Sequence, residues 1–200
     1  PATEEDFDLR PLPYAFDPAP YAKRVYNGVG RPLPETELIM GPNIADWPEI
    51  QPPAENLLVE LAAVLRDEVT TTDELIPSGE TSSYRSNPLR LAEFTLSRRE
   101  PRYVPRAKAI AAVEAERLAG KAPEQLVSLL NRVGDGAALL ETTQFGSAIY
   151  ANRPGDGSAR EQAASCQRVL GGRANLCRGF ATRRYRSNCI NWGILPFTMD

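Results

Sequence analysis

One stretch, residues 145–172, constrains the fold of this chain more than any other. It starts as an apolar run rich in strand-forming residues and passes through a turn bracketed by Gly155 and Gly157. It continues as a helical segment that starts at Ser158 and ends at two consecutive glycines. A strand, a glycine turn and a helix in this order leave backbone N–H groups at the helix start without partners inside the helix.

The start of this helical segment is predicted to bind an anion. Ser158 and Glu161 have the spacing of a capping box, in which both side chains satisfy free N–H groups. Those N–H groups and the positive end of the helix dipole face one point, and Arg160 adds a planar cation suited to a carboxylate. We therefore predict that the turn holds a carboxylate-bearing molecule beside Ser158. On local sequence alone, Ser158 as a plain helix cap is an equal alternative.

Composition bounds the class of protein and excludes several chemistries. The 200 residues suffice for one domain with an appended arm, and 42% apolar and 24% charged residues are ordinary for a soluble globular chain. The net charge of −3 argues against a general nucleic-acid binder. With no long apolar run and no signal-peptide pattern, we expect a cytoplasmic protein that does not span a membrane. The first residue, Pro1, suggests a fragment or a processed chain.

The side chains available for metal or covalent chemistry are few. The chain has no histidine, which excludes a His-based triad and an imidazole base. Its three cysteines, Cys166, Cys177 and Cys189, form no Cys-x-x-Cys motif. We therefore expect buried free thiols and no metal site made by this chain alone.

The chain divides into an arm and a folded domain. Residues 1–55 are rich in proline, which predicts an extended arm or linker with at most one short strand, in residues 38–47. Aromatic residues are expected to anchor this arm on a surface: Tyr14, Phe16, Tyr21, Tyr26 and Trp47.

The rest of the chain, residues 56–200, mixes strand and helix patterns, which indicates an α/β domain. Residues 56–69 fit a helix and a short buried strand equally well. The periodicity predicts helices over residues 89–98, 104–120, 123–134 and 182–192, strands over 137–141, 145–151 and 173–178, and an extended path over 194–197.

Three blocks of sequence, in register from about residue 57 to 199, resemble the carboxy-terminal swivel domain of the aconitase family of iron–sulfur hydro-lyases. Thr71-Thr72-Asp73 with Arg85 resembles the family's Thr-Thr-Asp…Arg block, and Gly157-Ser158-Ala159-Arg160-Glu161 resembles its Gly-Ser-Ser-Arg-Glu block. The third block is Leu170-Gly-Gly-Arg-Ala-Asn…Gly-Phe-Ala…Ser-Asn…Gly-Ile-Leu-Pro-Phe197.

The resemblance implies a swivelling β/β/α fold in which residues 57–65 are a strand and residues 100–135 are a helical insert. It implies that Ser158 is the catalytic serine, that Arg85 and Arg160 bind substrate carboxylates, and that Asp73 and Ala159 lie at the substrate. The substrate would be a di- or tricarboxylate. The 4Fe–4S cluster would be on a partner domain or subunit, so that this chain binds no cofactor and is inactive alone.

Two positions depart from the family pattern. Ala159 replaces a second serine, and Glu74 replaces a common histidine, so citrate–isocitrate isomerisation itself is not expected. The chain also ends soon after Phe197, where larger members continue. The alternative function is a non-catalytic relative that binds protein or RNA through a basic face made by Arg183, Arg184 and Arg186.

Overall fold

The computed structural model describes residues 14–22 and 29–199, which fall into two compact units, Pro1–Ile39 and Met40–Asp200. The first unit contains a short helix, α1 (Ala19–Ala22), beside which Phe16 stacks on Tyr21 with ring centroids 5.7 Å apart. Tyr14, Phe16 and Tyr21 are exposed, and their role as anchors of the arm stays a prediction. Tyr26 lies outside the described residues.

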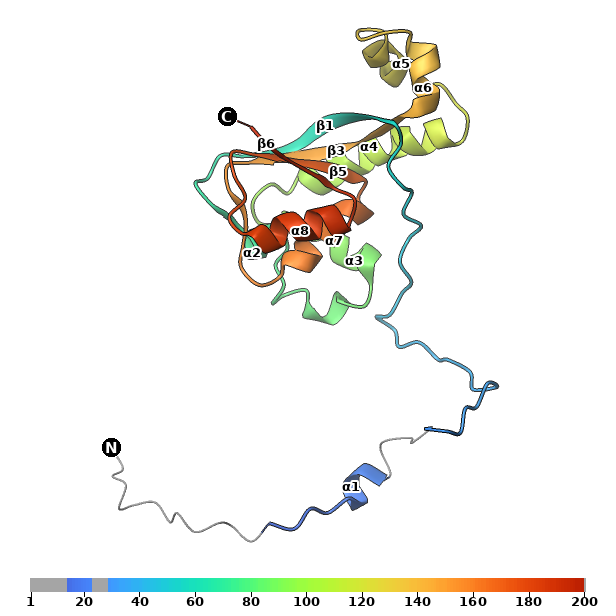
Figure 1. Cartoon of the computed structure of the whole chain (residues 1–200), viewed down its shortest axis with the longest axis vertical. Coiled ribbons are helices and arrows are strands. Elements are labelled where there is room, and N and C mark those ends of the chain that lie inside the picture. Colours follow the sequence, from blue (N-terminus) through green and yellow to red (C-terminus); the bar gives the residue numbers. More distant parts are fainter. Residues whose placement is uncertain (1–13, 23–28, 200) are drawn as a thin grey trace, which may run out of the picture. The chain divides into compact units, whose positions relative to one another are not determined.

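The second unit is built on a four-stranded parallel sheet (Figure 1). The order of the strands in the sheet is β1-β3-β5-β6. Their bounds are Asn56–Leu65 for β1, Thr143–Ala151 for β3, Gly172–Cys177 for β5 and Leu195–Thr198 for β6. The mixed α/β class predicted from the sequence is thus confirmed. Residues 38–47, where the sequence allowed one short strand, contain none.

The centre of this sheet is covered on both faces. Nearly every residue of β3 is buried, whichever face its side chain points to, as is typical of a parallel strand packed between layers. β1 pairs with β3 along its length, from Asn56 opposite Thr143 to Leu65 opposite Ala151. The apolar run that fitted a helix and a strand equally well is therefore a strand, because it supplies an outer partner for β3.

Helices connect the strands and pack on the sheet. α4 (Tyr103–Leu118) contacts β3 and β1, and its buried stripe includes Tyr103, Ala107 and Ile110. Figure 1 shows α7 (Arg160–Val169) and α8 (Arg183–Asn191) together on one side of the sheet, with α3 (Pro88–Ala92) next to α7. The helices predicted over 104–120 and 182–192 are confirmed with ends shifted by one or two residues.

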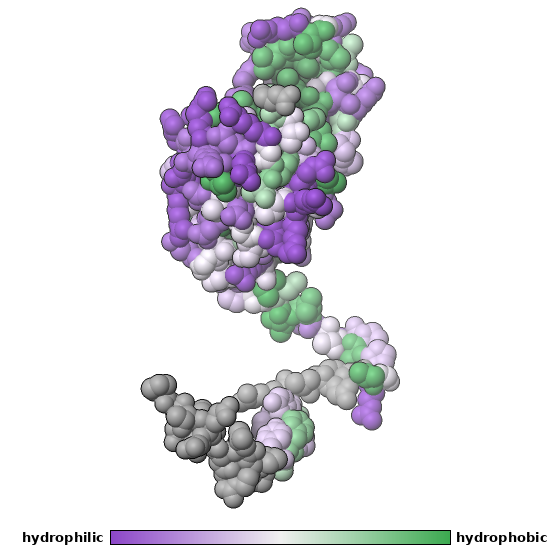
Figure 2. Space-filling model, turned by 60° about the vertical axis from the view of Figure 1, so that its left-hand side comes forward, coloured by the Kyte–Doolittle hydropathy of each residue, from purple (hydrophilic) through white to green (hydrophobic). Residues whose placement is uncertain are grey.

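A helical projection follows α4. α5 (Glu124–Leu130) packs against α6 (Gly136–Thr142), away from the rest of the second unit in Figure 1. The strand predicted over 137–141 is wrong, because Asp135 caps a helix there by accepting hydrogen bonds from the amides of Ala137 and Ala138. Apolar side chains gather at the upper end in Figure 2, and Val133 and Leu118, which flank α5, are among the exposed large apolar residues.

The three thiols are buried and unpaired, as predicted. Burial raises the pKa of Cys166 to about 12 and the pKa of Cys177 and Cys189 to about 11. A raised folded-state pKa stabilises the fold below the ordinary value of 9.0, and this contribution is lost as the pH rises through the folded value.

We therefore expect the free energy of unfolding to fall as the pH rises from 9 towards 11, as measured by urea denaturation. At neutral pH a thiol reagent should label the native chain slowly and label all three cysteines in denaturant. Rapid labelling of the native chain at neutral pH would contradict this prediction.

Candidate functional site

The glycine turn that precedes α7 is held by a second, two-stranded sheet. β4 (Pro154–Asp156) pairs in parallel with β2 (Thr70–Thr71), so the turn lies beside the loop that follows β2. Gly157 has φ +124°, and a Cβ at this position would meet the Thr72 hydroxyl at 2.3 Å. Only glycine allows this approach, and it brings the residue after Gly157, Ser158, next to the start of α2 (Thr72–Leu75).

Ser158 lies between two neighbouring hollows. One, of about 200 Å³, is lined by Ser158, Ala159, Gln162, Ser78 and Arg85. The other, of about 440 Å³, is lined by Ser158, Arg160, Glu161, Arg183, Arg184, Ser187 and Asn188. The structure therefore brings Ser158 to Arg85 on one side and to Arg160 on the other. Ser158 itself is exposed and makes no hydrogen bond with the described residues.

The capping box predicted for Ser158 and Glu161 is wrong. α7 begins one residue later than expected, so its N-cap is Ala159, whose side chain cannot accept a hydrogen bond. Glu161 instead accepts hydrogen bonds from the Asn188 amide and, at 2.6 Å, from Nε1 of Trp192. Asn188 and Trp192, at the end of α8, therefore bind the carboxylate that was predicted to cap the start of α7. The Ser158 hydroxyl has no hydrogen-bond partner among the described residues.

The first turn of α7 keeps unused donors. The amides of Arg160, Glu161 and Gln162 have no acceptor among the described residues. The guanidinium of half-buried Arg160 donates to the carbonyl of Gly157, which folds this side chain back over the turn. Amide donors, a helix dipole and a fixed cation therefore surround Ser158, and this arrangement suits an anionic ligand.

Asp73 lies in a different arrangement from the one expected. Its carboxylate pairs with Arg98 at 2.8 Å, and Arg98 also pairs with Glu80 at 2.5 Å. Neither of the two hollows around Ser158 is lined by Asp73. Its place at a substrate stays a prediction.

A capping box that the sequence analysis missed lies at the start of α2. Thr71 accepts a hydrogen bond from the amide of Glu74, and the Glu74 carboxylate accepts one from the amide of Thr71 at 2.7 Å. Glu74 also pairs with Arg99 at 3.1 Å. The Thr-x-x-Glu spacing was the available signal. Because Glu74 has these partners, its negative charge is largely engaged within the fold.

Arg183 and Arg184 belong to the basic face of the alternative function, and in the structure they line the same hollow as Ser158 and Arg160. Both are exposed, and neither forms an ion pair with the described part of the chain. The N-cap residue of α8, Thr182, fixes the start of this helix by accepting a hydrogen bond from the Tyr185 amide and by donating one to the carbonyl of Gly155. α8 therefore carries Arg183 and Arg184 to the glycine turn.

The described residues offer no place for a metal or a cluster. They contain no group of three or more Cys, Asp or Glu side chains arranged to hold a metal ion. The three thiols are buried, and burial raises the pKa of each, which opposes the thiolate form that a metal would need. Within the described ranges, none of the helices has both the length and the apolar character needed to cross a membrane.

Comparison with family models places the end of the chain. Residues 137–200 match the family model described as the aconitase C-terminal domain. This segment contains the glycine turn, Ser158, Ala159 and Arg160, whereas Asp73 and Arg85 lie before it. No curated protein matches the chain.

Proposed function

We propose, from the match of residues 137–200 to the aconitase C-terminal domain, that the chain is the swivel part of an aconitase-type hydratase. The reaction would dehydrate or rehydrate a di- or tricarboxylic acid. Ser158 would be the base, and Arg85 and Arg160 would bind substrate carboxylates. The observation that carries this proposal is the position of Ser158, exposed between two hollows that are each lined by arginine.

The surroundings of Ser158 fit the charge that such a reaction develops. Removing a proton next to a carboxylate builds negative charge on the substrate, and preorganised N–H donors and guanidinium groups stabilise it. A serine hydroxyl is too weak an acid to ionise at neutral pH without such donors. The free amides at the start of α7 and the cation of Arg160 support this role.

The substrate we propose differs from citrate. Ala159 gives the hollow a methyl group where a second serine would give a hydroxyl, which removes one hydrogen bond to a carboxylate. Arg183 and Arg184 add two cations to the neighbouring hollow. Because these two arginines share that hollow with Ser158, we assign them to substrate rather than to RNA.

The rest of the active site would come from a partner domain that carries a 4Fe–4S cluster. The described residues do not suit such a cluster, since no ligand group is present among them and the thiols are buried. Domains of this kind normally pair with the cluster-bearing domain of the same enzyme. In this arrangement the 200-residue chain alone has no hydratase activity.

The test of the proposal is reconstitution. The chain combined with its cluster-bearing partner should interconvert a hydroxy acid and the corresponding unsaturated acid, followed by ultraviolet absorbance over a panel of di- and tricarboxylates. Neither part alone should turn over any member of the panel. An assembled enzyme with an intact cluster and no turnover of any acid would refute the proposal.

A further inference from the structure

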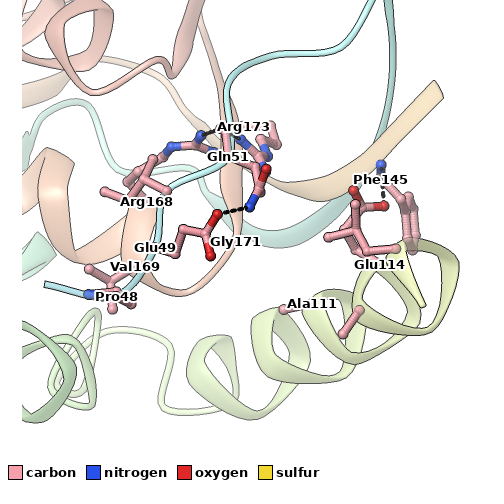
Figure 3. Close-up of a pocket in the computed structure, with 13 residues that line it drawn as sticks. Pro48, Glu49, Gln51, Ala111, Glu114, Phe145, Arg168, Val169, Gly171 and Arg173 are labelled. Carbon is pink, nitrogen blue, oxygen red and sulfur yellow. Dashed lines mark hydrogen bonds between the residues drawn. The ribbon is translucent and has the colours of Figure 1, made fainter. Parts of the chain in front are cut away.

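A third hollow lies at the opposite end of α7 from Ser158. α7 has ten residues, so the two ends are roughly 15 Å apart. The hollow measures about 180 Å³ and lies between residues 48–51, α4, the last turn of α7 and the start of β5 (Figure 3). It is small beside the roughly 300–1,000 Å³ of an ordinary ligand pocket, so it suits a small molecule.

Two buried arginines line this hollow. Arg168 is 5% exposed and Arg173 is 7% exposed. Figure 3 shows both guanidinium groups turned towards Gln51, and each donates one hydrogen bond to its carbonyl, at 2.5 Å from Arg168 and 3.3 Å from Arg173. Neither arginine forms an ion pair with any described residue. The two buried, positively charged guanidinium groups therefore share one neutral acceptor, the carbonyl oxygen of Gln51.

Most donors of the two side chains have no acceptor among the described residues. A guanidinium has five N–H groups, and each of the two arginines donates one hydrogen bond to the described residues. Nε of Arg168 and Nε of Arg173 are buried and have no hydrogen-bond partner in the part of the chain that the structure describes. A buried charge without a counter-charge costs free energy, and burial accordingly lowers the pKa of the Arg168 guanidinium.

The two acids that line the hollow do not neutralise these charges. Glu114 is buried, and its carboxylate oxygens accept hydrogen bonds from Arg117 at 2.8 Å and from the amide of Phe145 at 3.0 Å. Glu49 is exposed and accepts a hydrogen bond from the Gln51 side-chain amide at 2.6 Å. The hollow therefore keeps a positive charge.

The fold makes room for Arg173 in particular. A Cβ on Gly146, in β3, would meet Cγ of Arg173 at 2.1 Å. A bare backbone at this position of the central strand lets the stem of the arginine cross the sheet surface into the hollow. The buried guanidinium is thus built into the packing, and it is not a surface side chain that has folded inward.

We propose that this hollow binds a small oxoanion, such as phosphate or a short dicarboxylate, through the free N–H groups of Arg168 and Arg173. The bound anion would supply the missing counter-charge next to the carbonyl of Gln51. The site is separate from the two hollows around Ser158, so this proposal does not depend on the proposed hydratase function.

The test is a titration of the 200-residue chain with inorganic phosphate at constant ionic strength, followed by NMR of the arginine Nε–H groups. The Nε–H signals of Arg168 and Arg173 should shift saturably, and the signal of exposed Arg132 should not. Malonate in place of phosphate distinguishes a preference for phosphate from a preference for carboxylate. Absence of a saturable shift with either anion would overturn the proposal.

Variants give a second readout by calorimetry. Arg173→Gln should weaken phosphate binding about tenfold or more. A hydrogen bond to a charged group contributes about 1.5–3 kcal/mol, and about 1.4 kcal/mol corresponds to a tenfold change in affinity. Arg132→Gln, which removes the same charge from an exposed position, should bind phosphate as the parent chain does. Equal loss in both variants would show that phosphate responds only to net charge and would overturn the proposal.

Glu49→Gln separates the proposal from its closest rival, in which Glu49 itself swings in as the counter-ion. Under the proposal, the parent chain binds phosphate and Glu49→Gln binds it more tightly, because one repulsive charge is removed. Phosphate binding seen only in Glu49→Gln would identify Glu49 as the occupant and overturn the proposal.

Discussion

Replacing Ser158 with alanine should lower kcat of the assembled enzyme by about 10²–10⁴-fold, the usual contribution of a positioned acid or base. KM should change little, because the carboxylates of the substrate are bound by arginines that the substitution leaves in place. Ser158 is exposed and makes no hydrogen bond with the described residues, so the free energy of unfolding should stay within about 0.5 kcal/mol of the parent value. Steady-state kinetics and urea denaturation measure the two effects.

Ser187→Ala is a matched control for this result. Ser187 lines the same hollow as Ser158, but its hydroxyl donates to the backbone carbonyl of Arg183 at 3.1 Å. Its loss should leave kcat close to the parent value. If Ser158→Ala keeps parent-like turnover, or if both variants lose activity equally, Ser158 is not the base.

Gly155→Ala should destabilise the fold by about 2–5 kcal/mol, the sum of overpacking and backbone strain. Gly155 has φ +96°, and a Cβ there would lie 2.2 Å from the ring of Tyr185, which is fully buried. That ring cannot move aside, because the Tyr185 hydroxyl accepts hydrogen bonds from Gln167 at 2.8 Å and from Asn175 at 3.2 Å. The substitution would therefore strain the packing of the glycine turn against Tyr185, which holds α7, β5 and α8 together.

Gly179→Ala is the control for the second result. A Cβ at Gly179 would meet nothing within 4 Å, and its backbone needs no positive φ. This variant should unfold within about 0.5 kcal/mol of the parent chain. The comparison is made by urea denaturation, and equal stability of the two variants would show that the turn and Tyr185 separate without strain.

Local sequence patterns predicted the long elements of the fold well. The helix over 104–120 follows from an apolar stripe with a period near 3.6 residues, and the structure has it at Tyr103–Leu118. The strand over 145–151 follows from a run of strand formers that is buried on both faces. For residues 56–65 the pattern alone was ambiguous, and the resemblance to a swivel domain gave the correct strand.

The errors come from places where a neighbour in space decides the structure. Residues 137–141 have apolar content that fits a strand, but the cap at Asp135 and packing on α5 make a helix. Glu161 has the correct spacing to cap a helix with Ser158, but Trp192, 31 residues later, binds its carboxylate. Residues that are distant in sequence supply these competing partners, so a local pattern cannot reveal them.

The same limit applies to the hollow at the end of α7. Gln51 lies 117 positions from Arg168 and 122 from Arg173, and no motif links the three residues. By contrast, three of the predicted site residues, Ser158, Ala159 and Arg160, lie next to one another in the chain. Their placement around one turn follows directly from the unit of strand, turn and helix.

The contact between the rings of Trp47 and Trp192 makes the intrinsic fluorescence of the chain a reporter of its structure. These are the only two tryptophans of the sequence, and their ring centroids are 4.7 Å apart. Trp47 directly precedes the residues 48–51 that cover the arginine pair, and Trp192 donates to Glu161 at the start of α7. The whole tryptophan emission of the protein therefore comes from one ring contact, and a shift in its wavelength would signal separation of residues 48–51 from the helix ends without any added dye.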